Sequence, residues 1–370
     1  MRLEVICANG STCSNEEKMS KRNDIRLQRA IAVFMIPVVM WLGACDERGQ
    51  GPSDQEPVAD CPVIDLVDNC GNTCTGYPPI NDLGTGYWRG LQGGLYPGGS
   101  NTRPTAHNDG GMNLISQIQP LNVFGDPDSS DGEIVFLAIG MSNSEYEFDK
   151  LKEAIDTMSG KNPYLRIVNG AQGGWDINKI IVPDTTFWLT IDSMMALQGL
   201  SNEQVQVIWY KEAELAPLTF APDTSYLAYI DYLKEKLILS MHLIAERYPN
   251  AKVAYCASRI YGGYDATLGN PEPFAYYTGW SVKRMIEDQI NGDPSLIYEG
   301  TGRNSPWLAW GDYIWADGLK PRSDGLIYVC PDDFLEDGRH PSDPVGRVKV
   351  AMVLMDFFDS DETSIPWLFE

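Results

Sequence analysis

The sequence predicts an α/β fold, a three-layer α/β/α sandwich around a parallel five-stranded sheet. From residue 133 onward, short apolar runs alternate with longer amphipathic segments. Continuous apolar runs are typical of parallel strands covered on both faces, and their alternation with helices requires crossover connections. Ligands of such sheets bind beyond the carboxyl ends of the strands, so residues that directly follow each strand are the candidates for a functional site.

The expected elements follow in order along the chain. Five strands are predicted, at residues 133–139, 164–168, 205–210, 251–256 and 326–329. Helices are predicted at residues 146–158, 188–200, 225–248, 273–290 and 345–358. Apolar residues recur in these helices at three- and four-residue intervals, as Phe148, Leu151 and Ile155 do in the first. Pro249 ends the third helix, and Pro273 opens the fourth, where a missing N–H costs no hydrogen bond.

Composition argues against one class of function. The 370 residues include 28 Lys and Arg against 51 Asp and Glu, which gives a formal net charge of −23. Binding to nucleic acid requires clustered Lys and Arg that neutralise phosphates, and the sequence has no basic stripe of that kind. We therefore expect no nucleic-acid partner. The length suits one large domain or two small ones.

The first 44 residues have the pattern of an export signal. Basic residues lead into an apolar run at 30–42, which is too short to span a bilayer comfortably. Small residues then precede Cys45, in an order that resembles the bacterial lipobox, where the cysteine is acylated. We expect residues 1–44 to be a signal peptide, with the true start at Met19. The mature protein is then an exported lipoprotein, anchored to a lipid membrane through Cys45 on the periplasmic side or at the cell surface. An ordinary signal peptide or an N-terminal anchor helix is the alternative.

Two segments without regular apolar periodicity precede the predicted sheet. Residues 45–80 are rich in Cys, Pro and Gly, and we interpret them as a lipid-anchored tether. Residues 81–132 carry Gly and Asn turn signals and are expected to form an irregular lead-in to a domain at 133–370. Export permits disulfides, and an odd number of cysteines leaves one thiol free or paired elsewhere. The five cysteines after Cys45 are Cys61, Cys70, Cys74, Cys256 and Cys330. At least one local pair is expected among the first three.

The first chemical motif is Gly140-Met141-Ser142-Asn143, which directly follows the first strand and precedes a helix. A serine at this point lies beside backbone N–H groups of a helix N-terminus, which can stabilise an oxyanion. The alternative is that the serine only caps the helix.

The second motif contains Asp337 and His340, which come just before the last helix. A hydroxyl needs an imidazole to take its proton, and a carboxylate to orient that imidazole. Of the three histidines, His107 lies in the lead-in and His242 inside a long helix, so His340 is the candidate base. One alternative is that Asp337 and His340 only form part of a polar turn. A metal site is another, formed by Asp332, Asp333, Asp337 and His340.

Two further motifs follow the second and third strands. Gly173 and Gly174 come after the second strand, where glycine lets a backbone N–H approach a substrate closely. Lys211 and Glu212 come after the third strand, where polar side chains can point into the same crevice. The alternatives are a tight turn and a salt-bridged loop.

The order of the four motifs resembles the SGNH (GDSL-like) hydrolase superfamily over about residues 133–358, and most of all its sialate O-acetylesterase and acetylxylan esterase branch. The family's Gly-Gly and Asp-x-x-His-Pro motifs are matched by Gly173-Gly174 and Asp337 to Pro341. Its Gly-Gln-Ser-Asn motif is similar to Gly140 to Asn143, and Trp209 to Glu212 looks like a variant of its Trp-x-Gln-Gly-Glu motif. The resemblance implies a flavodoxin-like fold for the domain, with no cofactor and no metal.

The resemblance also implies roles for the matching residues. Ser142 is the nucleophile, His340 the general base and then acid, and Asp337 the group that orients His340. The backbone N–H groups of Ser142 and of Gly174 or Gly173 form the oxyanion hole. Lys211 stands where the family has Gln or Asn, and it is expected as a third donor, although a lysine is a flexible charged group.

A weaker set of residues is assigned to substrate binding. Flat aromatic rings suit the apolar faces of sugars, although core packing is the alternative. The set is Asn143, Trp175, Trp209, Glu212, Arg259 and Tyr261. The expected function is an exported serine esterase that removes acyl groups, acetyl among them, from a carbohydrate. The alternatives are a glycan-binding protein without catalysis, which the Lys211 departure favours, and a hydrolase of another ester. The oligomeric state is left open.

Overall fold

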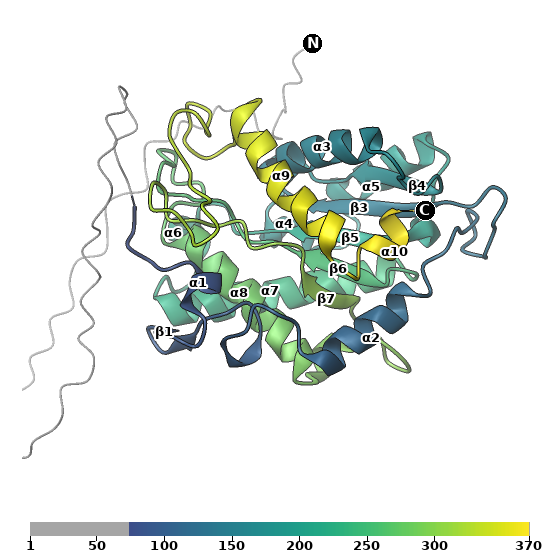
Figure 1. Cartoon of the computed structure of the whole chain (residues 1–370), viewed down its shortest axis with the longest axis horizontal. Helices are drawn as coiled ribbons and strands as arrows, with labels where there is room; N and C mark the ends of the chain where they lie inside the picture. Colours follow the sequence, from purple (N-terminus) through teal and green to yellow (C-terminus); the bar gives the residue numbers. More distant parts are fainter. Residues whose placement is uncertain (1–73, 370) are drawn as a thin grey trace, which may run out of the picture. The chain divides into compact units, whose positions relative to one another are not determined.

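The computed structural model describes residues 74–369, and these residues build the predicted α/β fold around a parallel five-stranded sheet (Figure 1). The strand order is β4-β3-β5-β6-β7, and every neighbouring pair is parallel. The strands are β3 (Ile134–Gly140), β4 (Leu165–Asn169), β5 (Val205–Lys211), β6 (Val253–Cys256) and β7 (Trp307–Trp310). β3 and β5 lie inside the sheet and are buried along their whole length, as their apolar runs predict.

Helices cover both faces of the sheet. The main helices are α3 (Ser142–Thr157), α5 (Thr186–Leu197), α7 (Tyr226–Arg247), α8 (Phe274–Ile290) and α9 (Val345–Ser360). Successive side chains of a strand point to opposite faces. On β5, Trp209 stacks on Phe148 of α3, while the Tyr210 hydroxyl lies 2.6 Å from Ser240 Oγ of α7. α9 packs beside α3, and α8 beside α7, so the sheet is the middle of three layers.

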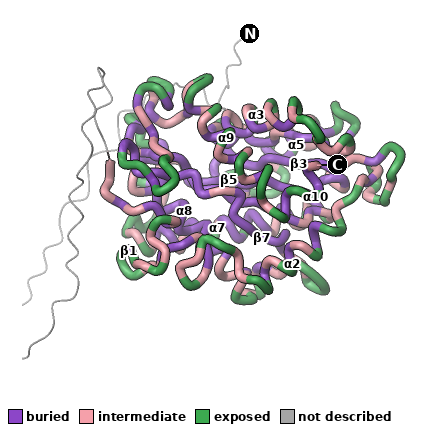
Figure 2. The backbone as a smooth tube through the Cα atoms, in the orientation of Figure 1, coloured by how far each residue is buried: buried purple, intermediate pink, exposed green. Residues whose placement is uncertain are grey.

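Short elements complete the described chain. They are α1 (Ile80–Leu83), α4 (Ile177–Ile180), α6 (Pro217–Phe220), α10 (Ile365–Leu368), the 3-10 turns at Pro97–Gly99, Asn202–Gln204 and Pro294–Leu296, and a two-stranded antiparallel pair of β1 (Tyr87–Trp88) and β2 (Leu91–Gln92). Figure 2 shows the buried backbone concentrated in the sheet and along the inward sides of its helices. None of the helices among residues 74–369 is long and apolar enough to cross a membrane.

The prediction of the fifth strand at 326–329 is wrong. The fifth strand is β7, which pairs with β6 from Val253↔Trp307 to Cys256↔Trp310 and is fully buried. Residues 326–329 form irregular chain before the loop that carries Asp337 and His340. There the Tyr328 N–H donates to the Gly318 carbonyl, and the Val329 N–H donates to Asp333 Oδ2 at 2.7 Å. Both segments are short apolar runs, and only the pairing with β6 distinguishes them.

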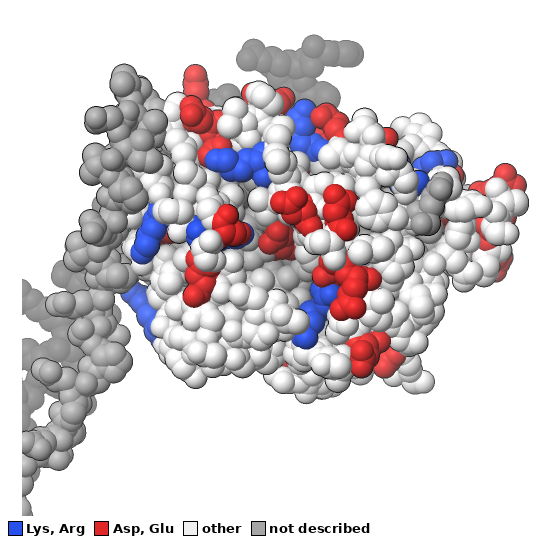
Figure 3. Space-filling view, viewed as in Figure 1, with Lys and Arg blue, Asp and Glu red and all other residues white. Residues whose placement is uncertain are grey.

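The described surface reflects the acidic composition. On the face that Figure 3 shows, which includes α9, acidic side chains outnumber basic ones. Of the cysteines within the described residues, Cys74 and Cys330 are disulfide-bonded, and Cys256 is a buried free thiol. Cys256 is therefore the free thiol among the three cysteines that the structure describes. The predictions for the signal peptide, Met19, Cys45, Cys61 and Cys70 lie outside the described residues.

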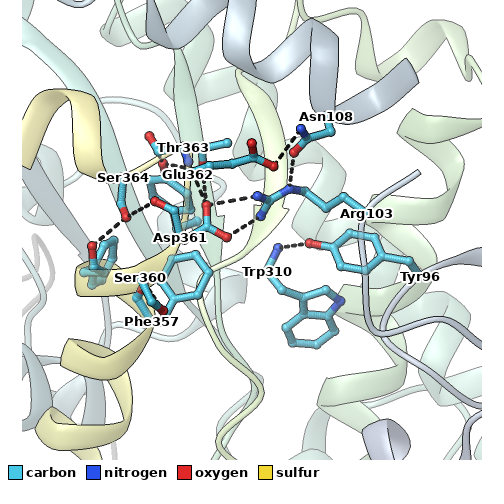
Figure 4. Close-up of polar contacts among 12 residues, drawn as sticks. Tyr96, Arg103, Asn108, Trp310, Phe357, Ser360, Asp361, Glu362, Thr363 and Ser364 are labelled. Carbon is cyan, nitrogen blue, oxygen red and sulfur yellow. Dashed lines mark hydrogen bonds and ion pairs between the residues drawn. The ribbon is translucent and has the colours of Figure 1, made fainter. Parts of the chain in front are cut away.

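The prediction that 81–132 is irregular is wrong for α2 (Thr105–Ile115). Gly110 and Gly111 make this segment a poor helix by propensity, so tertiary contacts must hold it. A Cβ on Gly111 would lie 2.3 Å from the Trp307 ring, so glycine permits the close approach to β7. Just before α2, Arg103 makes paired contacts of 3.0 and 2.9 Å with the Asp361 carboxylate beyond α9 (Figure 4). The lead-in is thereby fixed to the C-terminal part of the chain.

Candidate active site

The nucleophile candidate Ser142 is the first residue of α3, two residues after β3 ends at Gly140. A Cβ on Gly140 would lie 2.4 Å from Ser144 Oγ and 2.5 Å from the Lys211 carbonyl oxygen, so the turn closes only around glycine. Ser144 Oγ donates to that carbonyl at 2.7 Å and fixes the turn to β5. The helix has no side-chain cap, so the capping alternative for Ser142 is not realised.

Ser142, His340 and Asp337 form a continuous hydrogen-bonded chain. His340 Nε2 lies 2.7 Å from Ser142 Oγ, and His340 Nδ1 lies 2.5 Å from Asp337 Oδ2. Asp337 Oδ1 accepts the backbone N–H groups of His340 and Arg339, each at 3.0 Å. The three side chains come from opposite ends of the domain sequence, yet they have the geometry of nucleophile, base and orienting carboxylate.

The loop that carries Asp337 and His340 is tied directly to the nucleophile helix. Asn143 is 1% exposed, and its Nδ2 donates to the Arg339 carbonyl at 2.9 Å. Within the loop, the Leu335 N–H donates to the His340 carbonyl at 2.8 Å. The assignment of Asn143 to substrate binding is therefore corrected, because its side chain is used to hold the catalytic loop.

The charge states suit general-base catalysis at neutral pH. Burial lowers the pKa of His340, and the neighbouring Arg339 and Arg259 charges act in the same direction, against the carboxylate of Asp337. Partial burial acts to raise the pKa of Asp337, but hydrogen bonds from His340 and Arg339 outweigh it and leave that pKa lowered. His340 is then neutral and Asp337 ionised at pH 7, the states that proton abstraction from Ser142 requires.

The glycine loop after β4 lies beside the nucleophile. The Gln172 N–H donates to the Gly140 carbonyl at 2.9 Å, and a Cβ on Gly173 would lie 3.7 Å from Ser142 Cβ. A Cβ on Gly173 would also lie 3.7 Å from Glu145 Oε2. Gly174 has a φ of +79° and open space where a Cβ would be. Either glycine is thus a candidate to donate to an oxyanion, together with Ser142 at the start of α3.

Lys211 ends β5 and points into the interior. The residue is 1% exposed, and its Nζ forms an ion pair with the fully buried Glu147 of α3. Burial lowers the pKa of Lys211 to about 8 and raises that of Glu147. The ammonium that the resemblance assigned to the oxyanion hole thus already has a carboxylate partner beneath the nucleophile helix.

Three residues of the substrate-binding set lie in the interior and are corrected. Trp209 is fully buried against Phe148, Tyr261 is 1% exposed and packs on Tyr264, and Glu212 is 1% exposed. The rings of Trp209 and Tyr261 therefore pack in the core, which was the alternative given for the aromatic residues. Trp175 is half-buried next to Gly174 and packs on Phe187, with ring centroids 5.9 Å apart, so part of its surface is accessible. Arg259 is also buried.

Sequence reasoning missed the support beneath the His340 ring. The Tyr146 ring meets it edge-on, with centroids 5.5 Å apart, and the Arg347 guanidinium lies 3.9 Å from the Tyr146 centroid. Tyr146 follows Ser142 by four residues on the same helix, so helical spacing places both on one face. That spacing is the signal that could have found it.

The alternative metal site is not formed. Asp333 is ion-paired with Lys349, and Asp337 is bonded to His340. Among residues 74–369, no group of three His, Cys, Asp or Glu side chains is arranged to hold a metal ion.

Comparisons with known proteins add little to the geometry. No family model matches the chain, and no curated protein matches it. Among solved structures, the chain is similar to a protein described as "a putative SGNH hydrolase" from Slackia heliotrinireducens. The sequence identity is 17%, the match covers 61% of this chain and 99% of that one, and the TM-score is 0.32. A likeness this distant carries no argument about activity, so the function is inferred from the site itself.

Proposed function

We propose that the chain is a serine ester hydrolase of the SGNH type. The observation that carries the proposal is the chain of contacts from Ser142 Oγ through His340 to Asp337, at 2.7 and 2.5 Å. Its position after β3, at the carboxyl end of a parallel sheet, is where such sheets bind ligands. The motif order along the sequence supports the same class.

The proposed mechanism has two stages. Ser142 Oγ attacks the ester carbonyl carbon while His340 Nε2 takes the hydroxyl proton, and the N–H groups of Ser142 and Gly174 stabilise the oxyanion. The tetrahedral intermediate then collapses, and the leaving alcohol takes the proton from Nε2. In the second stage, His340 Nε2 removes a proton from water, which attacks the acyl carbon. The bond from that carbon to Ser142 Oγ then breaks, Oγ takes the proton back from Nε2, and the acid is released. Asp337 stabilises the imidazolium in both stages.

The finer part of the proposal concerns substrate and location. The esterase removes acyl groups, acetyl among them, from a carbohydrate, and the half-exposed Trp175 beside Gly174 supports a sugar ring at the site. Export and membrane anchoring through Cys45 are proposed from the lipobox-like sequence alone. The expected partners are the ester substrate and a lipid membrane.

A glycan-binding protein without catalysis is the second candidate. The observation in its favour is that one of the expected oxyanion donors, Lys211, is already ion-paired with Glu147. On this alternative, Ser142 and His340 would contact a ligand without turnover.

Turnover separates the two candidates. We would measure hydrolysis of p-nitrophenyl acetate and acetate release from acetylated sugars with the protein from Asp46 onward. Ser142→Ala is compared with Ser193→Ala, an exposed helical serine whose hydroxyl bonds only its own helix. Loss of the nucleophile should reduce kcat by at least about a thousandfold, and the control should keep the parent rate. Equal rates in all three proteins, or none in any, would reject the esterase and favour the binding protein.

A further inference from the structure

Three arginines gather around His340, although the protein carries a formal net charge of −23. Arg339 precedes His340 in the catalytic loop, Arg347 lies over the Tyr146 ring that contacts His340, and Arg259 follows β6. The charges of Arg339 and Arg259 both act on the His340 imidazole. The surroundings of His340 are thus rich in arginine, although the protein as a whole is acidic.

Arg259 has no ion-pair partner among the residues that the structure describes. It is 1% exposed, its Nε donates to Asn270 Oδ1 at 3.2 Å, and its Nη1 has no hydrogen-bond partner. Arg259 forms no ion pair within the part of the chain that the structure describes, residues 74–369. Burying a charge without a partner is costly, and a guanidinium has five N–H groups to satisfy. The side chain therefore keeps positive charge and donor capacity that the protein itself does not use.

The acidic groups around Arg259 are engaged elsewhere. Glu147 is paired with Lys211, and Asp265 accepts the N–H groups of Thr267 and Asn270 at 2.8 and 2.9 Å. The Glu272 carboxylate accepts the Gly262 N–H at 2.9 Å and the Trp315 Nε1–H at 2.8 Å. Burial raises the pKa of the Glu212 carboxyl well above its usual value, which disfavours its charged form.

Arg339 contacts the loop at 265–270, which also carries Asn270, the hydrogen-bond partner of Arg259. Its Nη1 donates to Thr267 Oγ1 at 3.0 Å, and a Cβ on Gly269 would lie 2.0 Å from that nitrogen. The next residue is Asn270, which bonds Arg259. Arg339 Nη2 lies 3.7 Å from Asp337 Oδ2, its Nε has no hydrogen-bond partner, and 23% of the side chain is exposed. The loop at 265–270 thus contacts two guanidinium groups, one partly exposed and one buried, and both charges act on the His340 imidazole.

The position of Arg339 beside His340 determines which part of the ester substrate it can contact. His340 delivers its proton to the leaving alcohol, so the alcohol part of the ester lies on the His340 side of Ser142. The glycine loop at 173–174, with its candidate oxyanion donor, borders Ser142 separately. A charged group that meets Arg339 therefore belongs to the alcohol part.

We propose that Arg339, backed by Arg259, forms an anion subsite, and that the preferred substrates are esters whose alcohol part carries a carboxylate. The subsite deepens the proposed function and rests on it. A guanidinium binds a carboxylate through charge-assisted hydrogen bonds, and its planar fork suits two carboxylate oxygens. Arg339 makes the direct contact, while Arg259 adds a second positive charge that no carboxylate within residues 74–369 neutralises in an ion pair.

The test compares two acetyl esters that differ in charge, 4-acetoxybenzoate and its methyl ester. We expect the parent protein to prefer the anion, and Arg339→Gln to reduce that preference, the ratio of the two kcat/KM values, by about tenfold or more. Arg259→Gln should reduce the preference, and Arg259→Lys should restore most of it. The matched control is Arg166→Gln on β4, which removes an arginine paired with Glu133 and should keep the parent preference. An unchanged preference in Arg339→Gln would overturn the subsite.

A binding measurement keeps the subsite testable if no turnover is found. Titration calorimetry with 4-hydroxybenzoate should detect binding to the parent protein that is at least about tenfold weaker in Arg339→Gln. Equal affinity in the two proteins, or no binding to either, would contradict the subsite. Absence of Ser142-dependent turnover with Arg339-dependent binding would reject the esterase alone.

Discussion

Replacing Asn143 with alanine removes the hydrogen bond that joins the catalytic loop to the nucleophile helix. Asn143 is 1% exposed and its Nδ2 lies 2.9 Å from the Arg339 carbonyl oxygen, so the change leaves a carbonyl next to His340 without that donor. An unsatisfied buried acceptor costs about 1–3 kcal/mol. If that amount is lost where His340 meets Ser142, kcat falls by roughly 5- to 160-fold.

The assay for Asn143→Ala is kcat and KM for p-nitrophenyl acetate across pH, with thermal unfolding measured in parallel. We expect kcat to fall while KM changes little, because the hydrogen bond from Asn143 to the Arg339 carbonyl positions His340. Asn143→Asp should lose at least as much activity, since an ionised carboxylate cannot donate to the Arg339 carbonyl. Parent kcat in a folded Asn143→Ala protein would refute the reasoning, and so would a loss confined to KM.

Three further predictions follow from the charged groups. The kcat/KM for a neutral ester should rise with pH through an apparent pKa below 6.5, because burial lowers the pKa of His340 and only the neutral imidazole accepts a proton. A rise of kcat/KM centred above pH 7 would contradict this. Lys211→Met should destabilise the fold by about 3–5 kcal/mol in denaturant unfolding by leaving Glu147 unpaired, whereas combining it with Glu147→Leu should recover part of the loss; equal losses would contradict the pairing. Arg103→Ala should lower the free energy of unfolding by about 1–3 kcal/mol through loss of the Asp361 contacts, with kcat unchanged; an unchanged unfolding midpoint would contradict it.

The sheet was predictable where strands are long and continuous. The apolar runs of β3 and β5 have seven residues each, and the helices that follow them repeat with helical spacing. The four-residue run of β7 could not be told from the run at 326–329, because position in a sheet depends on pairing and not on local composition. α2 was missed because Gly110 and Gly111 lower helix propensity, and its stabilising neighbour Trp307 is almost 200 residues away.

The residues of the candidate site were predictable for a different reason. With three histidines in the chain, His340 is the one that follows a carboxylate in a loop, and Ser142 follows a strong strand. The burial of Trp209 was not predictable, because core and surface aromatic residues have the same local pattern. The Lys211–Glu147 pair joins residues 64 apart in sequence, and nothing local indicates the contact.

The most direct test of the central claim is the intact mass of the protein after incubation with a fluorophosphonate inhibitor. The account predicts a single adduct, located on Ser142 by peptide mapping, that is absent in Ser142→Ala and forms far more slowly in His340→Ala. An unmodified protein, or an adduct that persists in Ser142→Ala, would contradict the claim that Ser142, His340 and Asp337 form a working catalytic site.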